Sequence, residues 1–313
     1  MKFQGQHILS TQQFDKKSLL SLFAEAKKME KVVKSGPDVK SGSSSRFGRD
    51  LKGKIMATLF YEPSTRTRFS FETAMLRLGG GVVSNADMMQ TSSIKKLETL
   101  EDTGKVVSQI VDVIVMRHPE SGAVALFAQH SDVPVINAGD GSNEHPTQAL
   151  LDLYTIWKEF GKIDGLTIGM IGDLKNSRVQ HSQIGLLKHF KVKFVLVSPR
   201  GLEMPSAILK EMGASAKVVL TPEDMVETAD VISVSRIQKE RFVSEREYKQ
   251  FVGSFVVDAA LMKKAKKNAI VMQPLPRVDD IAVEVDSDPR ARYFEQVRNG
   301  VAVRMALLKM VLK

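Results

Sequence analysis

Between residues 60 and 68 the chain reads Phe60-Tyr61-Glu62-Pro63-Ser64-Thr65-Arg66-Thr67-Arg68. The apolar run 54–59 before this stretch has the character of a β-strand. After it, Phe71, Met75 and Leu78 recur at the spacing of one helix face. The pattern predicts a strand, a short polar loop and a helix, which is the repeating unit of an α/β protein.

The hydroxyl and guanidinium side chains of this loop fall at the predicted helix N-terminus. Unpaired backbone N–H groups and the positive end of the helix dipole favour an anion there. Ser64, Thr65 and Thr67 are ordinary capping residue types, but one cap needs only one hydroxyl. Capping also does not account for Arg66 and Arg68 beside them. We therefore predict that the loop binds an anion such as phosphate.

The composition indicates two domains and no thiol chemistry. A chain of 313 residues is long for one compact core. Its hydrophobic content of 43% and charged content of 26% are ordinary for a globular protein. The sequence has no cysteine, which excludes disulfides, zinc–thiolate sites and thiol nucleophiles. The histidines lack metal-ligand spacing, so neither a metal nor another cofactor is expected.

The charge distribution indicates the class of ligand, and the lack of targeting signals indicates the location of the protein. The formal net charge is +9, and the arginines stand singly beside polar loops rather than in a dense block with aromatic residues. This distribution favours small anionic substrates over nucleic acid. No apolar run reaches the roughly 18 residues of a membrane helix, and the N-terminus carries no signal or transit pattern. We expect a cytoplasmic protein with no membrane partner.

Apolar runs with strand character alternate with segments of helical periodicity along the chain. The predicted strands are 54–60, 111–116, 133–136, 166–171, 192–197, 216–220, 230–235 and 269–272. Repeated βα units predict an α/β fold with two similar domains, each a parallel β-sheet flanked by helices. The first domain is assigned to 1–145 and the second to 146–289, joined by a long helix that starts at Pro146. The helix predicted over 290–313 is expected to pack back on the first domain.

Polar motifs follow several predicted strands, where ligands bind in open α/β sheets. These motifs are 60–68, Arg117-His118-Pro119, 143–148, 172–182, 236–241 and 273–277. We expect them to face one cleft, in which arginines pair bidentately with anionic groups. The 172–182 loop lacks the three-glycine pattern of dinucleotide sites. Residues 92–96 form a small polar loop that is predicted to act as a mobile lid, and 35–45 is predicted to be a polar loop without regular structure.

Three of these motifs together resemble a known family. They are Ser64-Thr65-Arg66-Thr67-Arg68, His145-Pro146-Thr147-Gln148 and Pro274-Leu275-Pro276-Arg277. In this order they resemble the aspartate/ornithine carbamoyltransferase family over essentially the whole chain. The Pro-Leu-Pro-Arg form and the pair Arg236 and Gln238 are similar to the aspartate-specific catalytic chains. The ornithine enzymes carry a cysteine in that loop, and this chain has none.

The resemblance implies roles for individual residues. Carbamoyl phosphate would be bound by Ser64, Thr65, Arg66, Thr67, Arg117, His145 and Gln148. Of these, the catalytic set would be Arg66, Thr67, Arg117 and His145, with Gln148 at the amino group of the substrate. Aspartate would be bound by Lys96, Arg178, Arg236, Gln238, Leu275 and Pro276. Ser92 and Lys96 would come from a neighbouring subunit of a homotrimer with shared active sites, and assembly with regulatory chains stays open.

The lid departs from the family at one position. Leu97 stands where the family usually has glycine in Lys-Lys-Gly-Glu. A residue with a branched side chain does not easily take positive φ, so the resemblance does not fix the path of the lid.

The reaction that the resemblance implies needs no protein nucleophile. The uncharged α-amine of L-aspartate would attack the carbamoyl carbon, and phosphate would leave, giving N-carbamoyl-L-aspartate, a pyrimidine precursor. Orientation and electrostatic stabilisation would supply the catalysis. Three alternatives stay open: a carbamoyltransferase with another amine acceptor, a non-catalytic binding or regulatory protein on this scaffold, and a basic nucleic-acid binder.

Overall fold

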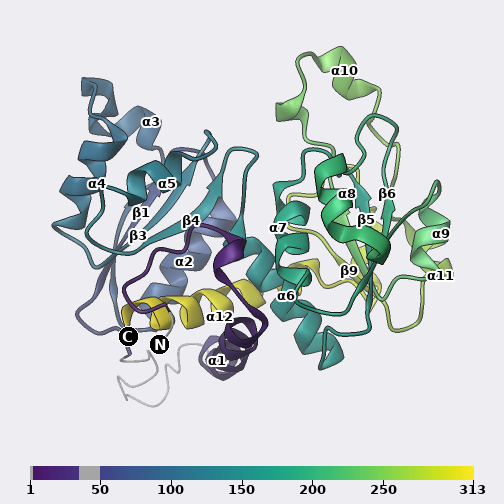
Figure 1. Ribbon diagram of the computed structural model, residues 1–313, viewed down its shortest axis with the longest axis horizontal. Coiled ribbons are helices and arrows are strands. Elements are labelled where there is room, and N and C mark those ends of the chain that lie inside the picture. The colour runs from purple at the N-terminus through teal and green to yellow at the C-terminus, as the bar shows by residue number, and fades with distance from the viewer. Residues whose placement is uncertain (1–2, 35–49) are drawn as a thin grey trace. The chain divides into compact units, whose positions relative to one another are not determined.

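The computed structural model describes residues 3–34 and 50–313 (Figure 1). The chain forms two compact units, one of Met1–Tyr154 with Val297–Lys313 and one of Thr155–Gln296. The divisions fall inside two helices, α6 (Pro146–Phe160) and α12 (Tyr293–Leu312), rather than at their first residues. The polar loop predicted over 35–45 lies outside the described residues.

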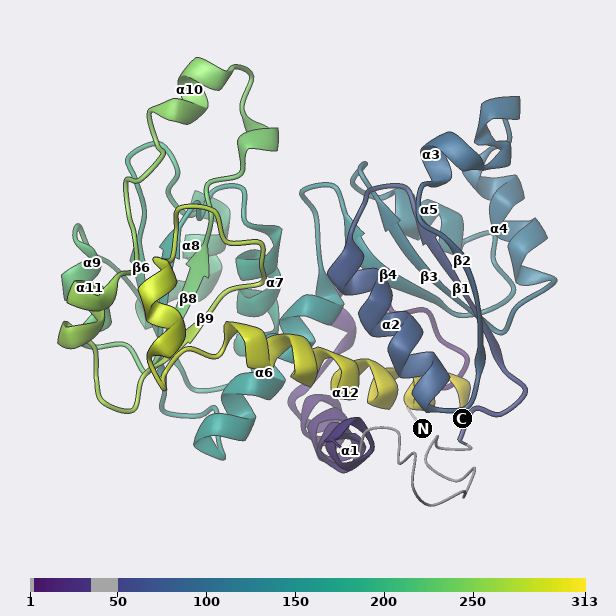
Figure 2. The same cartoon turned by 180° about the vertical axis from the view of Figure 1, so that it is seen from behind.

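The first unit is built on a parallel sheet with the strand order β2-β1-β3-β4. Its strands are β1 (Ile55–Phe60), β2 (Gly81–Asn85), β3 (Val113–His118) and β4 (Val135–Asp140). Its helices are α1 (Lys16–Lys34), α2 (Thr65–Arg77), α3 (Met88–Thr91), α4 (Leu100–Ser108) and α5 (Ala123–Ala128), with the short 3₁₀ helices η1 (Thr11–Gln13) and η2 (Ser93–Lys96). Helices α4 and α5 cover one face of the sheet (Figure 1), and α2 lies on the other (Figure 2).

The second unit contains a parallel sheet with the order β7-β6-β5-β8-β9. Its strands are β5 (Thr167–Gly172), β6 (Lys193–Val197), β7 (Ala216–Val218), β8 (Val231–Ser235) and β9 (Ile270–Met272). Its helices are α7 (Arg178–Leu187), α8 (Ser206–Met212), α9 (Pro222–Val226), α10 (Glu245–Lys249) and α11 (Ala259–Lys264), with η3 (Gly213–Ser215), η4 (Lys239–Arg241) and η5 (Val283–Ser287).

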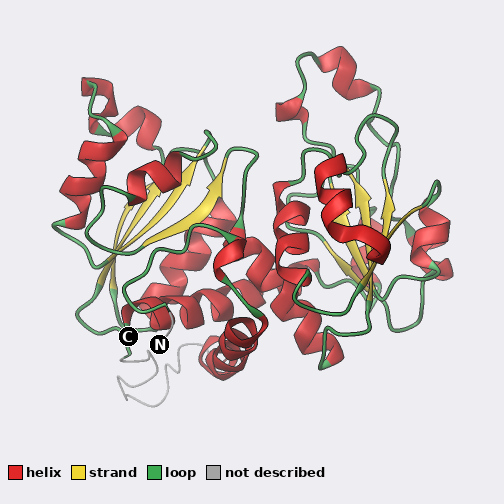
Figure 3. Cartoon of the chain, in the orientation of Figure 1, coloured by secondary structure: helices red, strands yellow, loops and turns green. Residues whose placement is uncertain are grey.

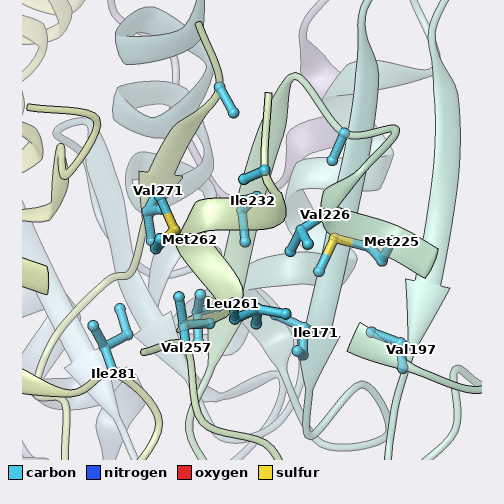
Figure 4. Packing of buried hydrophobic residues seen from close by; sticks show 14 of the residues in the cluster. Ile171, Val197, Met225, Val226, Ile232, Val257, Leu261, Met262, Val271 and Ile281 are labelled. Carbon is cyan, nitrogen blue, oxygen red and sulfur yellow. The ribbon is translucent and has the colours of Figure 1, made fainter. Parts of the chain in front are cut away.

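Both sheets are buried by apolar side chains, as two-sided parallel sheets require. In the second unit, Ile171 of β5 and Ile232 of β8 pack with Met225 of α9 and Leu261 of α11 in one cluster (Figure 4). In the first unit, Ile114 of β3 belongs to the corresponding cluster beneath α5. Burial on both faces explains why these strands read as continuous apolar runs.

The α/β fold class is confirmed, and so is each predicted strand, with small shifts at the ends (Figure 3). The sequence analysis missed β2 and α3. Strand β2 lies at the edge of its sheet, directly follows the glycines at 79 and 80, and leaves Val83 49% exposed. An exposed edge strand therefore lacks the apolar run that identifies the central strands. Among the described residues, none of the helices combines the length and hydropathy needed to cross a membrane.

Glycine is required where β5 ends. Gly172 has φ +108° and pairs in register with Ser235 of β8. A Cβ atom at position 172 would lie 1.9 Å from the carbonyl oxygen of Ser235. The two strand ends can therefore approach this closely only because position 172 has no side chain.

Gly172→Ala is expected to lower the free energy of unfolding by about 3 kcal/mol or more, since it combines backbone strain with a backbone clash. Gly161→Ala is the matched control: its φ is +69°, but a Cβ there meets no described atom within 4 Å. The control should cost only about 0.5–1 kcal/mol, because backbone strain of about 1–2 kcal/mol is partly offset by the chain entropy that glycine loses on folding, about 0.5–1 kcal/mol. Urea denaturation measures the free energy of unfolding of both variants. Equal decreases would show that the close approach to Ser235 does not destabilise the alanine variant at position 172.

Candidate active site

The phosphate-binding loop predicted from the sequence lies at the start of α2, directly after β1. Ser64 is the N-cap residue, with φ −158° and ψ 94°, yet its side chain makes no capping hydrogen bond with the described part of the chain. Ser177, at the same position of α7, does cap its helix by accepting from the backbone N–H of Gln180. The Ser64 side chain therefore does not occupy the backbone donors of the first turn of α2, where the positive dipole end favours an anion.

The side chains of this loop differ in exposure and in role. Thr67 is buried, whereas Thr65 and Arg66 are exposed on the first turn. Arg68 points to the neighbouring strand, because its Nη1 donates to Ser84 Oγ at 3.0 Å and lies 3.5 Å from Glu72 Oε1. Of the two arginines in the motif, Arg68 braces β2 against α2 and Arg66 is the one exposed beside the helix start.

Arg117, the penultimate residue of β3, is held in place at the carboxyl end of the sheet. Its Nη2 donates to Glu62 Oε1 at 2.8 Å, and its Nη1 lies 3.5 Å from the carbonyl oxygen of Ala138 in β4. The backbone carbonyl of Arg117 accepts from Tyr61 N–H at 2.8 Å. The guanidinium is therefore fixed between the ends of β1, β3 and β4, with Glu62 of the same loop motif as its ionic partner.

A buried carboxylate shapes the loop that carries His145. Asp140, 2% exposed at the end of β4, accepts from the backbone N–H of Gly122 at 2.9 Å and from Asn143 Nδ2 at 3.0 Å. It also accepts from Asn137 Nδ2 at 2.9 Å and from the backbone N–H of Glu144 at 3.2 Å. The sequence analysis gave Asp140 no role.

His145 and Gln148 follow at the start of α6, as predicted. His145 is 4% exposed and precedes Pro146, the first helical residue. Gln148 is 8% exposed, and its Nε2 donates to Asp152 Oδ1 at 2.9 Å. His118 is a separate case: its Nδ1 accepts from the backbone N–H of Glu120 at 3.0 Å, and burial lowers its pKa. His118 therefore supports the loop after β3 in its neutral form.

In the second unit, a buried carboxylate connects two of the predicted motifs. Asp173, fully buried after β5, accepts from the backbone N–H of Asn176 at 3.0 Å. Burial raises the pKa of Asp173, and hydrogen bonds from Asn176 and from the backbone of Gln238 oppose that shift. The carboxylate thus ties the loop before Arg178, the first residue of α7, to the loop that contains Arg236 and Gln238.

Arg236 has a preformed ionic partner on its own loop. Its Nη1 donates to Glu240 Oε2 at 3.1 Å, and its Nη2 pairs with Glu240 Oε1. Burial alone would raise the pKa of Glu240, but the hydrogen bonds and charge of Arg236 outweigh it, so the pKa is lowered. The guanidinium is about one quarter exposed and its orientation is set by this bidentate pair.

The Pro-Leu-Pro-Arg loop is organised by an amide that the sequence analysis gave no role. Gln273 is 2% exposed; its Nε2 donates to the Pro276 carbonyl at 3.1 Å, and its Oε1 accepts from Leu275 N–H. Leu275 has φ +57°, and its bond to Pro276 is cis. Arg277 turns away to pair with Asp286. The loop is therefore tied to itself around Gln273, which sets the direction of the Leu275 carbonyl.

The predicted lid residues lie on the short helices α3 and η2. Ser92 is the C-cap residue of α3 and donates to the Met88 carbonyl at 2.5 Å, and Lys96 is exposed at the end of η2. Leu97 does take the left-handed conformation, with φ +67°, and its side chain is 91% exposed. Exposure lets the backbone adopt this conformation without a clash, at a strain of about 1–2 kcal/mol. The contribution of Ser92 and Lys96 to a neighbouring subunit stays a prediction.

Comparison with known proteins gives the family. A model of the aspartate/ornithine carbamoyltransferase carbamoyl-P binding domain matches residues 6–158, and a model of the Asp/Orn binding domain matches 164–311. The chain belongs to the aspartate/ornithine carbamoyltransferase family. This confirms the resemblance drawn from the three sequence motifs.

Individual carbamoyltransferases are similar over nearly the full chain. The aspartate carbamoyltransferase catalytic subunit of Thermoplasma acidophilum is 47% identical over 99% of this chain and 99% of its own length. The multifunctional protein CAD of Squalus acanthias is 48% identical over 99% of this chain, which spans only 14% of that protein. A similar solved structure is aspartate transcarbamoylase from Trypanosoma cruzi in complex with carbamoyl phosphate and aspartate. It has a TM-score of 0.90 and 40% sequence identity, and the match covers 99% of this chain and 98% of the Trypanosoma chain.

In the part of the chain that the structure describes, no group of three or more potential metal-ligating side chains gathers. The predicted site residues divide between the units. Those for carbamoyl phosphate, from Ser64 to Gln148, lie in the first, and those from Arg178 to Pro276 lie in the second.

Asp140→Asn is expected to lower the free energy of unfolding by about 2 kcal/mol or more, because hydrogen bonds to a buried charged acceptor are lost or weakened. Asp132→Asn is the control, since Asp132 is exposed and accepts from Gln109 at the surface; it should change stability by less than about 0.5 kcal/mol. Urea titration at neutral pH measures both. A loss no larger than that of the control would contradict the structural role of Asp140.

Leu97→Gly is expected to raise the free energy of unfolding by about 0.5–1 kcal/mol. The relieved strain of about 1–2 kcal/mol exceeds the extra chain entropy of glycine, about 0.5–1 kcal/mol. Leu97→Ala keeps the Cβ atom and therefore the backbone strain, so it should not raise the free energy of unfolding. It should not lower it either, because the exposed Leu97 side chain contributes little buried surface. Denaturation curves of the two variants decide between them, and an equal effect of both would rule out backbone strain at position 97.

Proposed function

We propose that this chain transfers the carbamoyl group of carbamoyl phosphate to the α-amine of L-aspartate, giving N-carbamoyl-L-aspartate and phosphate. The observation that carries the proposal is the N-terminus of α2, where the side chain of the N-cap residue Ser64 does not cap the helix and Arg66 stands exposed beside it. The helix start and the guanidinium together match a phosphate dianion.

The carbamoyl half of the substrate would lie beside this phosphate position. Thr67, Arg117 and His145 would donate to the carbonyl oxygen, and Gln148 would contact the amino group. Arg117 suits this role because Glu62 and the end of β4 already hold its guanidinium. Donors that are fixed before the reaction stabilise the oxyanion that forms when the amine attacks, without reorganising during the step. The departing phosphate would take the proton of the attacking amine.

Aspartate would bind through residues of the second unit. Arg178, Arg236 and Gln238 would hold its two carboxylates, and the carbonyl of Leu275, before Pro276, would accept from its amine. The pairing of Arg236 with Glu240 supports this assignment, because it fixes the plane of the guanidinium while leaving other donors of the side chain to a substrate. We assign the carbamoyl phosphate domain to the first unit and the aspartate domain to the second, in keeping with the descriptions of the two family models.

The similar proteins support both the substrates and an assembly. The Trypanosoma cruzi protein was solved with carbamoyl phosphate and aspartate, and the Thermoplasma protein is named a catalytic subunit. We infer that the chain works as a homotrimer in which Ser92 and Lys96 of one subunit complete the site of the next. A catalytic subunit of this kind is also suited to associate with regulatory chains. The role in pyrimidine synthesis follows from the product.

An assay of carbamoyl transfer tests this function. The wild-type chain is expected to carbamoylate L-aspartate and not ornithine, measured as carbamoyl-amino acid formed from carbamoyl phosphate. Arg66→Ala should lower turnover by about 100-fold or more, because a donor to the developing charge is lost. Arg246→Ala, an exposed arginine of α10, is the control and should keep wild-type turnover.

Two outcomes would contradict the proposal in different ways. Transfer to ornithine but not to aspartate would overturn the acceptor assignment and leave the phosphate site standing. Near-normal turnover of Arg66→Ala would overturn the phosphate site itself. The size of the purified assembly, measured by light scattering for both variants, separates a loss of chemistry from a loss of the trimer.

A further inference from the structure

One buried amide at the end of β9 holds the backbone on both sides of the Leu275 carbonyl. Gln273 is 2% exposed and directly follows β9. Its Oε1 accepts from the backbone N–H of Leu275, and its Nε2 donates to the carbonyl oxygen of Pro276 at 3.1 Å. A backbone N–H only donates and a carbonyl only accepts, so these two contacts fix which end of the amide faces each residue. The carbonyl of Leu275 lies between the two bonded groups along the chain.

The amide is itself anchored to groups outside this short loop. Its Nε2 also donates to Asp280 Oδ2 at 2.8 Å, and Asp280 Oδ1 accepts from the backbone N–H of Val278 at 2.9 Å. The backbone N–H of Gln273 donates to Gln296 Oε1 of α12 at 2.8 Å. The backbone carbonyl of Asp280 accepts from Val257 N–H at 2.9 Å. Gln273 is therefore held by α12 and, through Asp280, by the segment at Val257.

This arrangement restricts the direction of the Leu275 carbonyl. The ring of Pro276 fixes φ of that residue. Because the Leu275 N–H and the Pro276 carbonyl are both bonded to Gln273, the peptide between them cannot turn without breaking one of these bonds. In the part of the chain that the structure describes, no group donates to the carbonyl oxygen of Leu275, a half-buried residue. A carbonyl that is held in this way can accept a hydrogen bond from a ligand.

We propose that Gln273 is a positioning residue for the attacking amine of the acceptor substrate, acting through the carbonyl of Leu275. An uncharged amine has two N–H groups and one lone pair. When the carbonyl accepts from one N–H, the directions open to the lone pair are restricted, which favours attack on the carbamoyl carbon. The bonds made and broken are those of the proposed function, and Gln273 itself exchanges no proton.

The contact between amine and carbonyl should strengthen during the reaction. As the amine nitrogen bonds to the carbamoyl carbon it gains positive charge, and a charged donor forms a stronger hydrogen bond to the Leu275 carbonyl. An interaction that is stronger in the transition state than in the bound substrate contributes to kcat. A carbonyl turned away by the loss of Gln273 should therefore lower kcat more than it lowers the affinity for the carboxylates of the acceptor.

The inference rests on the proposed function, so the test begins with carbamoyl transfer to L-aspartate by the full wild-type chain. Gln273→Glu keeps an oxygen that can accept from Leu275 N–H, but it removes the donor to the Pro276 carbonyl and to Asp280. Its kcat is expected to fall about tenfold or more, because the reacting amine is misplaced. Gln129→Glu, the same change at an exposed glutamine of the first unit, is the control and should keep the wild-type kcat.

Succinate separates the positioning of the amine from a general loosening of the aspartate site. It carries two carboxylates like aspartate but has no amine, so it should compete with aspartate without using the Leu275 carbonyl. Its inhibition constant, measured with saturating carbamoyl phosphate, should differ between the wild-type chain and Gln273→Glu by less than about twofold. A loss of succinate affinity as large as the loss of kcat would overturn the proposal, and so would a wild-type kcat in Gln273→Glu.

A second variant covers the case in which Gln273→Glu does not fold. Asp280→Asn offers one acceptor oxygen in place of two, so either Gln273 Nε2 or Val278 N–H loses its partner. Its kcat should fall about threefold, the scale of one hydrogen bond, with succinate inhibition unchanged. An unchanged kcat in this variant would contradict the proposal. A wild-type chain that does not carbamoylate L-aspartate would overturn the proposed function and this inference with it, whereas an active wild-type chain with unaffected variants would overturn the inference alone.

Discussion

Parallel pairing of strands is the constraint on which the rest of this structure depends. Each strand of a parallel sheet must be followed by a crossover, so all strands end at the same edge and each delivers one loop there. In the first unit, β1, β3 and β4 deliver the loops of Ser64, Arg117 and His145. In the second, β5 and β8 deliver those of Arg178 and Arg236. Residues that are far apart in the sequence are thus brought to one edge of their sheet by backbone pairing alone.

Pairing brings the loops together, but buried polar side chains give them their shape. Asp140 collects four donors around the turn before His145, Asp173 ties together the loops of Arg178 and Gln238, and Gln273 closes the loop of Leu275. Each is almost fully buried, and each uses oxygen atoms that would be costly to bury without donors. Their removal leaves backbone groups without partners, which makes these residues as important to the geometry as the side chains that would touch substrate.

The sequence could predict those parts of the molecule whose residue pattern within a single strand or helix reflects their burial. Central strands such as β3 and β5 are mostly apolar because both faces are buried, and the polar residues Arg117, His118 and Thr167 stand only at their ends. The edge strand β2 is half-exposed and mixed with glycine, serine and asparagine, so no local pattern marks it. Asp140 accepts from the distant Gly122, but its other donors lie within four residues, as do Leu275 and Pro276 around Gln273. These roles were missed because the residue types of a turn do not tell which backbone groups a side chain will bond. At Leu97 the residue type argued against a positive φ, yet the structure has one there, because the exposed side chain meets no obstacle.

Two of the predicted site arginines are held by ion pairs with glutamates of the same chain. Arg117 is paired with Glu62 and Arg236 with Glu240 within the chain. Each pair is partly exposed, so its net contribution to stability is small. Its effect on geometry is larger, because a long side chain that would otherwise sample several rotamers is held in one. Under the proposed function, an anionic group of either substrate would meet a guanidinium whose ordering entropy was already lost on folding, and more of the interaction energy would be left for the transition state. Cations that folding has already ordered would thus act together with the start of α2, and the proposed reaction would need no protein nucleophile.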